Sequence, residues 1–264
     1  MIDTSPPSFR AIWRDTIDAM TRLRWLSLIG LLIILSAEAI KVLALSDRLS
    51  LQEPVNLVCS ILLLPLDVAI YRLLILGEAA SRYRLDPFDH RFQRLLIWTI
   101  CWWGVIVLPP YVVSLITSAD QWSIVAFVGT LLLCIPLLRM IVLFPAIAVD
   151  ASGASLDNAI ADTRGQLWLI LKAFFLVWLL PVLAMCLVLL GTLLLGVLIS
   201  DTSTTSPDWS VSSSDWPAAL QIIFFGGLYF LTQVATAAMV SRLFGWIGSK
   251  VKGRDFQTAL PQGT

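Results

Sequence analysis

The sequence predicts an all-α fold, a polytopic membrane helical bundle of about six spans with an N-terminal interfacial amphipathic helix. Three observations lead to this prediction. Of the 264 residues, 58% are hydrophobic and only 14% are charged, whereas a soluble domain is nearer to half apolar and a quarter charged. Six apolar runs reach the length of about 20 residues that crossing a bilayer requires. Lysine and arginine are concentrated in alternate connecting segments, as expected for a protein that threads a membrane repeatedly.

The first segment, residues 1–24, is expected to form a cytoplasmic amphipathic helix in the membrane interface. Its apolar residues recur at helical spacing, and charged residues occupy the other faces. Ser8 follows two prolines and is a suitable N-cap. The arginines would lie near anionic headgroups, although a helix that binds a soluble partner would show the same pattern. The apolar positions are Phe9, Ile12, Trp13, Ile17 and Met20, and the charged positions are Arg10, Arg14, Asp18, Arg22 and Arg24.

The membrane domain is expected to cover residues 25–247, followed by a cytoplasmic tail over residues 248–264. The last three apolar runs exceed the minimum length, so tilt or kinks are expected, with Pro136, Pro145 and Pro181 as kink points. A short helix is expected to begin at Ser155 and to end at Gly165, between the fourth and fifth runs. The six runs cover residues 25–45, 55–79, 95–117, 122–149, 167–199 and 217–247.

The distribution of charge and of tryptophan predicts the orientation of the chain. Basic residues cluster before the first run, in the loops at 80–94 and 150–166, and in the tail, while the opposite segments contain Arg48 alone. The positive-inside rule therefore places both termini in the cytoplasm. Six tryptophans lie near predicted span ends, where the indole ring favours the headgroup zone. They are Trp25, Trp98, Trp122, Trp168, Trp216 and Trp246.

Two hairpins resemble each other and suggest an internal repeat. Residues 55–117 contain Pro65 and Pro109, which are 44 positions apart, and residues 122–199 contain Pro136 and Pro181, which are 45 positions apart. A duplicated hairpin would explain this spacing, and so would coincidence between leucine-rich helices. Repeats in membrane proteins often frame a site near the midplane of the bilayer.

Charged and polar residues within the spans are the candidate functional positions, because a charge in hydrocarbon is costly unless it faces protein or water. Glu38 and Lys41 can pair at a spacing of one turn, and Asp67 could pair with Arg139 from another helix. A structural ion-pair network is the favoured interpretation, and a polar path or ligand pocket among spans one, two and four is the alternative. An interhelical hydrogen bond is expected in the sixth span. The intramembrane polar candidates are Glu38, Lys41, Asp67, Arg72, Arg139 and Gln233.

Nothing in the sequence predicts a catalytic residue, a cofactor or a metal site. The four cysteines are isolated from one another within apolar runs, and His90, in a turn around Pro87, is the only histidine; a zinc or redox site needs clustered ligands. Motifs of metalloproteases, serine hydrolases and nucleotide-binding proteins are absent from the sequence. The formal net charge is zero, so no nucleic-acid partner is predicted.

One stretch carries a resemblance to a known family. An arginine within a span is followed by a proline-containing exit, an acidic-glycine turn, an amphipathic segment and Gly-x-x-Trp at the next span. This pattern resembles a bacterial six-span family that includes the membrane domain of some glycerophosphodiester phosphodiesterases and free-standing inner-membrane proteins of unknown function. The resemblance covers residues 130–180 and implies a bacterial inner-membrane location; the chain has no phosphodiesterase barrel, so that activity is not implied. It rests on Arg139, residues 143–150, Gly153, Leu156, Ala159, Thr163, Gly165 and Trp168.

The sequence therefore favours a non-enzymatic integral membrane protein that serves as a scaffold or accessory component. It would act through contacts with lipid, a membrane protein partner or a second copy of itself. The alternative is a small transporter or channel-like component whose path is lined by four of the intramembrane charges. An enzyme embedded in the membrane is the third hypothesis. The scaffold and transporter hypotheses differ in whether the intramembrane charges surround a cavity or pair with one another in a dry bundle. The residues of the transport path would be Glu38, Asp67, Arg72 and Arg139.

Overall fold

In the part of the chain that it describes, the computed structural model contains helices joined by turns and loops, and no strands. This part comprises residues 6–46, 49–80, 83, 86–116, 128–129, 132–133, 135–200 and 218–253. Four helices are long and apolar enough to cross a membrane, and they coincide with the predicted first, second, fifth and sixth spans. They are α2 (Arg24–Ala44), α3 (Leu49–Leu76), α8 (Leu167–Ser200) and α9 (Ala218–Ile247). The described chain is thus a multi-pass, all-helical membrane protein.

The predicted third and fourth runs are only partly described. Helix α4 (His90–Ile116) covers the third run, whereas much of the fourth, including residues 117–127, lies outside the described residues. The fourth run is not one continuous helix, since the chain turns at residues 140–142 before α6 (Leu143–Ala148). Pro145 accounts for this break, because it has no N–H to donate and its ring would clash with the preceding turn. The internal repeat depends on this region and stays a prediction.

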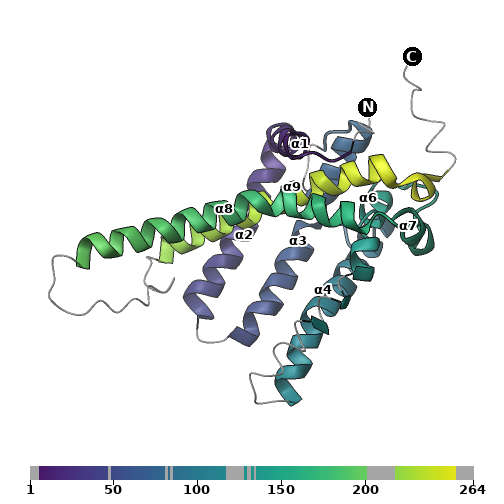
Figure 1. Cartoon of the computed structure of the whole chain (residues 1–264). Coiled ribbons are helices and arrows are strands. Elements are labelled where there is room, and N and C mark those ends of the chain that lie inside the picture. Colours follow the sequence, from purple (N-terminus) through teal and green to yellow (C-terminus); the bar gives the residue numbers. More distant parts are fainter. Residues whose placement is uncertain are drawn as a thin grey trace.

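Helix α9 is the central element of the bundle. It packs against α1, α2, α3 and α8, and together with α8 it crosses α2 and α3 at a steep angle (Figure 1). Glycines permit the close approach of these helices: a Cβ atom at Gly30 of α2 would lie 2.6 Å from Leu66, and one at Gly226 of α9 would lie 2.7 Å from Leu35. Small residues have this role in membrane bundles, where van der Waals packing drives helix association.

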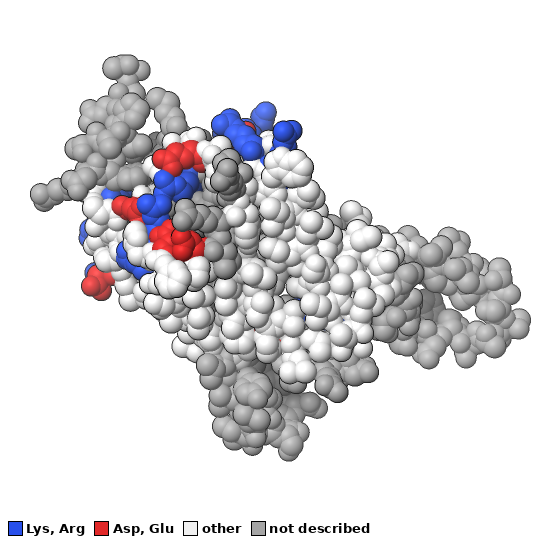
Figure 2. Space-filling view, turned by 180° about the vertical axis from the view of Figure 1, so that it is seen from behind, with Lys and Arg blue, Asp and Glu red and all other residues white. Residues whose placement is uncertain are grey.

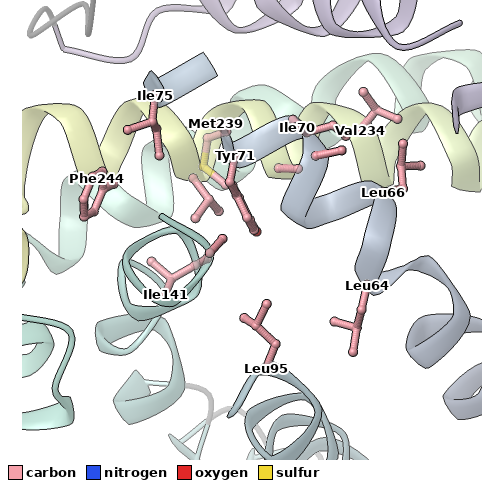
Figure 3. Packing of buried hydrophobic residues seen from close by; sticks show 14 of the residues in the cluster. Leu64, Leu66, Ile70, Tyr71, Ile75, Leu95, Ile141, Val234, Met239 and Phe244 are labelled. Atoms are coloured by element: carbon pink, nitrogen blue, oxygen red, sulfur yellow. The ribbon is translucent and has the colours of Figure 1, made fainter. Parts of the chain in front are cut away.

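The core lies where α3 and α9 cross, with additional residues from α4 and from the turn before α6. Figure 3 shows these side chains converging from the separate helices. They are closely packed: Leu66, Val234 and Phe244 are inaccessible to solvent. The outer surface differs, because on the face in Figure 2 the charged side chains gather near one end and the rest of the described surface is uncharged. Such a surface suits contact with lipid.

The N-terminal helix α1 (Phe9–Arg22) begins as predicted, with the Ser8 hydroxyl accepting a hydrogen bond from the backbone N–H of Ala11 at 3.3 Å. Its buried face consists of Ile12, Thr16 and Ala19, and the helix packs mainly on α9. Asp15 of α1 accepts a hydrogen bond from the Arg242 Nε of α9 at 2.5 Å. Arg242 is 4% exposed, so this residue belongs to the interior of the bundle rather than to a basic tail.

A second short helix, α7 (Leu156–Asp162), begins at its predicted N-cap, Ser155. It ends at Asp162, and Gly165 has a positive φ of 80° in the turn that follows. The Asp162 carboxylate reaches the start of a helical turn at residues 249–253, where it accepts hydrogen bonds from the backbone N–H groups of Lys250 and Val251 at 2.8 and 2.9 Å. The first described residues of the predicted tail are therefore anchored to the bundle.

Candidate functional site

One face of α3 carries a stripe of mostly polar residues that lines a cavity. The stripe runs from Glu53 to Tyr71 at intervals of three and four residues, which places all its members on the same side of a helix. Its length is about 27 Å at 1.5 Å per residue, close to the hydrocarbon thickness of about 30 Å in a typical bilayer. The members of the stripe are Glu53, Asn56, Ser60, Leu64, Asp67 and Tyr71.

The cavity has a volume of about 660 Å³, within the range of about 300–1,000 Å³ typical of small-molecule sites. Helices α2, α4, α8 and α9 and the segment around α6 form its other walls. Aromatic side chains form part of those walls, and polar residues of α2, α4 and α9 form another part, so the cavity combines aromatic and polar surfaces. The aromatic residues besides Tyr71 are Trp102, Trp103, Phe144, Phe174, Trp178 and Tyr229.

One end of the cavity holds a chain of hydrogen bonds between α2 and α3. The Lys41 Nζ donates to Glu38 at 2.5 Å and to the Asn56 Oδ1 at 3.1 Å. The Asn56 side-chain amide then donates to Glu53 at 3.4 Å. The predicted pairing of Glu38 with Lys41 is confirmed, and it leaves the positive charge of Lys41 compensated. Both side chains are mostly buried, with 15% and 17% exposed.

Asp67 lies one turn from the Tyr71 end of the stripe and is bound by Gln233 of α9. The Gln233 Nε2 donates to both carboxylate oxygens of Asp67, at 3.2 and 3.0 Å. The interhelical hydrogen bond expected of the sixth span is therefore confirmed. The predicted pairing of Asp67 with Arg139 is wrong, because no ion pair joins them within the described part of the chain. Similar depth in the membrane does not make two residues neighbours, since α9 rather than the fourth run presents a partner to Asp67.

Arg72 and Arg139 do not line the cavity, which corrects the predicted path. Arg72 follows Tyr71 by one residue and so points about 100° away from the stripe. Its guanidinium binds Glu78, with the Nε at 3.0 Å from the carboxylate, and donates to the Ala148 carbonyl at 3.3 Å. Arg139 has a buried Nε without a hydrogen-bond partner, and its carbonyl accepts a hydrogen bond from the buried Thr163 hydroxyl at 3.0 Å.

A second polar cluster surrounds the turn at Asp150, whose backbone has a positive φ of 53°. Arg91 forms an ion pair with Asp150, and the His90 Nε2 lies 3.4 Å from the same carboxylate. Arg94 donates to the Ala154 carbonyl at 2.7 Å. These contacts join the start of α4 to the turn after α6. The basic side chains bind the Ala154 carbonyl and the Asp150 carboxylate of the same chain, so we assign the cluster a structural role.

The cavity contains most of the predicted site residues, but more helices line it than the sequence predicted. Of the six intramembrane candidates, Glu38, Lys41, Asp67 and Gln233 line it. Spans three, five and six contribute walls in addition to spans one and two, and the described residues of the fourth run contribute Ile141 and Phe144. Sequence reasoning missed the uncharged members of the stripe. Their spacing of three and four residues on one face of α3 was the signal that could have identified them.

The described residues contain no group of three or more histidine, cysteine, aspartate or glutamate side chains that could hold a metal ion. The chemistry that the site offers is binding, because carboxylates, amides and aromatic rings line the same cavity. Comparisons with family models, with curated proteins and with solved structures yield no match to this chain. The resemblance seen at residues 130–180 stays a prediction.

Proposed function

We propose that this chain is a non-enzymatic membrane protein that acts by binding an amphiphilic molecule in the cavity between α2, α3, α4, α8 and α9. The observation that carries the proposal is a cavity lined both by the polar stripe on α3 and by aromatic side chains. A ligand with a polar end and an apolar body would satisfy both surfaces at once, whereas hydrocarbon alone would offer no counter-charge to the carboxylates of Glu53 and Asp67. Such a protein could deliver, present or sense its ligand as an accessory component of a membrane process.

The proposal includes a membrane arrangement. We infer six spans, an N-terminal helix at the cytoplasmic interface, and both termini in the cytoplasm of a bacterium, with the chain in the inner membrane. The positive-inside distribution supports this orientation. Membrane lipid is the first proposed partner. A membrane protein, or a second copy of this chain, is the other.

A cavity-filling variant with a matched control tests the proposed binding. Ser60→Phe would place a bulky side chain in the cavity, whereas Val58→Phe would place the same side chain on the exposed side of α3, where Val58 is 55% exposed. Each full-length protein is purified in a mild detergent, and the molecules that co-purify are identified by native mass spectrometry. We expect the parent and Val58→Phe to retain one specific molecule that Ser60→Phe has lost. Equal ligand content in both variants, or none in the parent, would refute the proposal.

The length of the stripe favours a small carrier as the second candidate function. Polar groups extend over about 27 Å along α3, so a ligand could exchange contacts step by step across most of the bilayer. Reconstituted into sealed vesicles, a carrier would move the co-purifying molecule into the lumen. A protein that only binds would hold it in a fixed ratio to the chain, without accumulation inside the vesicle.

A further inference from the structure

We propose that the ligand of the cavity is a lipophilic organic cation, with its positive charge held at Asp67. This inference rests on the proposed binding function and names the class of molecule that the site selects. It starts from the balance of charge among the residues that line the cavity. Among the residues that the structure describes, the lining includes the carboxylates of Glu38, Glu53 and Asp67 but only one cation, Lys41.

The single cation of the cavity is already paired. Lys41 binds Glu38 at 2.5 Å, and its second hydrogen bond goes to a neutral amide oxygen at 3.1 Å. Within the described part of the chain, neither Glu53 nor Asp67 forms an ion pair. The lining therefore carries an excess of negative charge, which attracts a cation and disfavours an anionic headgroup.

Asp67 is the carboxylate best placed to hold that cation. It lies near the Tyr71 end of the stripe, 14 residues from the exposed end at Glu53. Within the described part of the chain its hydrogen-bond partner is the side-chain amide of Gln233. An amide donor orients a carboxylate without cancelling its charge. A charge in a low-dielectric site attracts an opposite charge far more strongly than it would in water, so a cation at this point gains the most from the pairing.

The aromatic lining of the cavity favours an organic cation over a metal ion. Three tryptophans and two tyrosines line the cavity, at Trp102, Trp103, Trp178, Tyr71 and Tyr229. Aromatic faces attract organic cations through the ring quadrupole and also cover their apolar groups. A hard metal ion needs about six oxygen ligands, and the described residues contain no cluster that could hold one.

Two ions of nearly identical shape and opposite charge test the inference. The parent protein, purified in an uncharged detergent, is titrated calorimetrically with tetraphenylphosphonium and with tetraphenylborate. We expect the phosphonium cation to bind about tenfold or more tightly than the borate anion. Asp67→Asn, which keeps the shape of the side chain, is expected to weaken phosphonium binding by a similar factor, and Asp67→Glu is expected to retain most of it.

A charge-matched control separates the site from the overall charge of the protein. Asp157→Asn removes an exposed carboxylate of α7 that does not line the cavity, and it is expected to bind phosphonium as the parent does. Equal binding of the two ions, or unchanged binding by Asp67→Asn, would overturn the inference. If neither ion binds but a neutral or anionic molecule co-purifies and is lost in Ser60→Phe, the cation inference fails and the binding function stands. If nothing binds or co-purifies, both fail.

Discussion

At the scale of single residues, Gly153 and Gly253 mark the place where the turn after α6 meets the chain after α9. A Cβ atom at Gly153 would lie 2.8 Å from the Val251 carbonyl oxygen and closer still to that of Lys250. Gly253 has a positive φ of 72° and faces Ser152. The two backbones are therefore in direct contact, with the Asp162 carboxylate holding the helical turn in place.

Gly153→Ala tests this contact. Because a backbone carbonyl cannot move aside as a flexible side chain can, we expect the substitution to lower the free energy of unfolding by about 1–3 kcal/mol, the usual cost of overpacking. Thermal unfolding of the purified protein in detergent measures the change. Gly227→Ala in α9 is the control, since nothing lies within 4 Å of its Cβ position, and it should stabilise the helix by about 0.5–1 kcal/mol. Equal stability of the two variants would contradict the prediction.

Lys252 makes the same region sensitive to pH. Its Nζ donates to the Gly245 carbonyl at 2.5 Å and lies 5.5 Å from the centre of the Phe244 ring. Burial lowers the pKa of Lys252 below the ordinary value of 10.5, and the nearby Asp162 carboxylate partly opposes this change. The folded chain therefore releases this proton at a lower pH than the unfolded chain does.

The sign of the pH effect follows from this difference in proton binding. Between the lowered pKa and 10.5 the unfolded state binds more protons at Lys252, so stability rises as the pH increases through that window. The variant Lys252→Met has no proton to release there. We expect the thermal stability of the parent to rise relative to Lys252→Met as the pH approaches 10.5. Parallel stability curves for the two proteins over this range would exclude the effect.

At the scale of elements, the ion pair between Asp15 and Arg242 fixes α1 to α9. Arg242 is 4% exposed and Asp15 is 17% exposed, so a single substitution removes this ion pair from a largely buried charge. Removing one partner of a buried pair typically costs about 3–5 kcal/mol, whereas replacing both can be nearly neutral. We expect Asp15→Asn and Arg242→Gln each to lower thermal stability in detergent. The double variant should recover part of the loss, and strictly additive losses would show that the two residues act independently.

The helices themselves could be predicted from the sequence better than the contacts between them. Apolar length and capping residues predicted α2, α3, α8 and α9 and the start of α1 and α7, because these depend on local sequence. The choice of Gln233 as the partner of Asp67 could not be predicted in this way. Depth along a helix follows from counting residues, but the neighbour that a residue meets depends on how α9 crosses α3. The polar residues on one face of α3 recur every three or four positions in the sequence. A prediction based mainly on charged residues does not include the uncharged members of this face.

At the scale of the whole molecule, the proposed orientation gives a test by chemical labelling. Cysteines are introduced singly at Phe88, which is 89% exposed, and at Ser212, in a background without native cysteines. Ser212 is chosen from the sequence, because residues 200–216 contain Asp201, Asp208 and Asp215 and no lysine or arginine. An impermeant thiol reagent is applied to intact cells. Because the positive-inside rule places the 80–94 loop in the cytoplasm, we expect labelling at position 212 only. Labelling at position 88 would invert the orientation.

The pairing of α1 with α9 has a consequence for how the chain is made. Asp15 and Arg242 are 227 residues apart, so at 5–20 residues per second the first helix waits about 10–45 s for its partner to leave the ribosome. During that time the face of Ile12, Thr16 and Ala19 must be covered by lipid or by a chaperone. Helix α1 is therefore synthesised first but completes its packing last. A chain terminated before α9 would have an uncovered N-terminal helix, which membrane proteases could cleave.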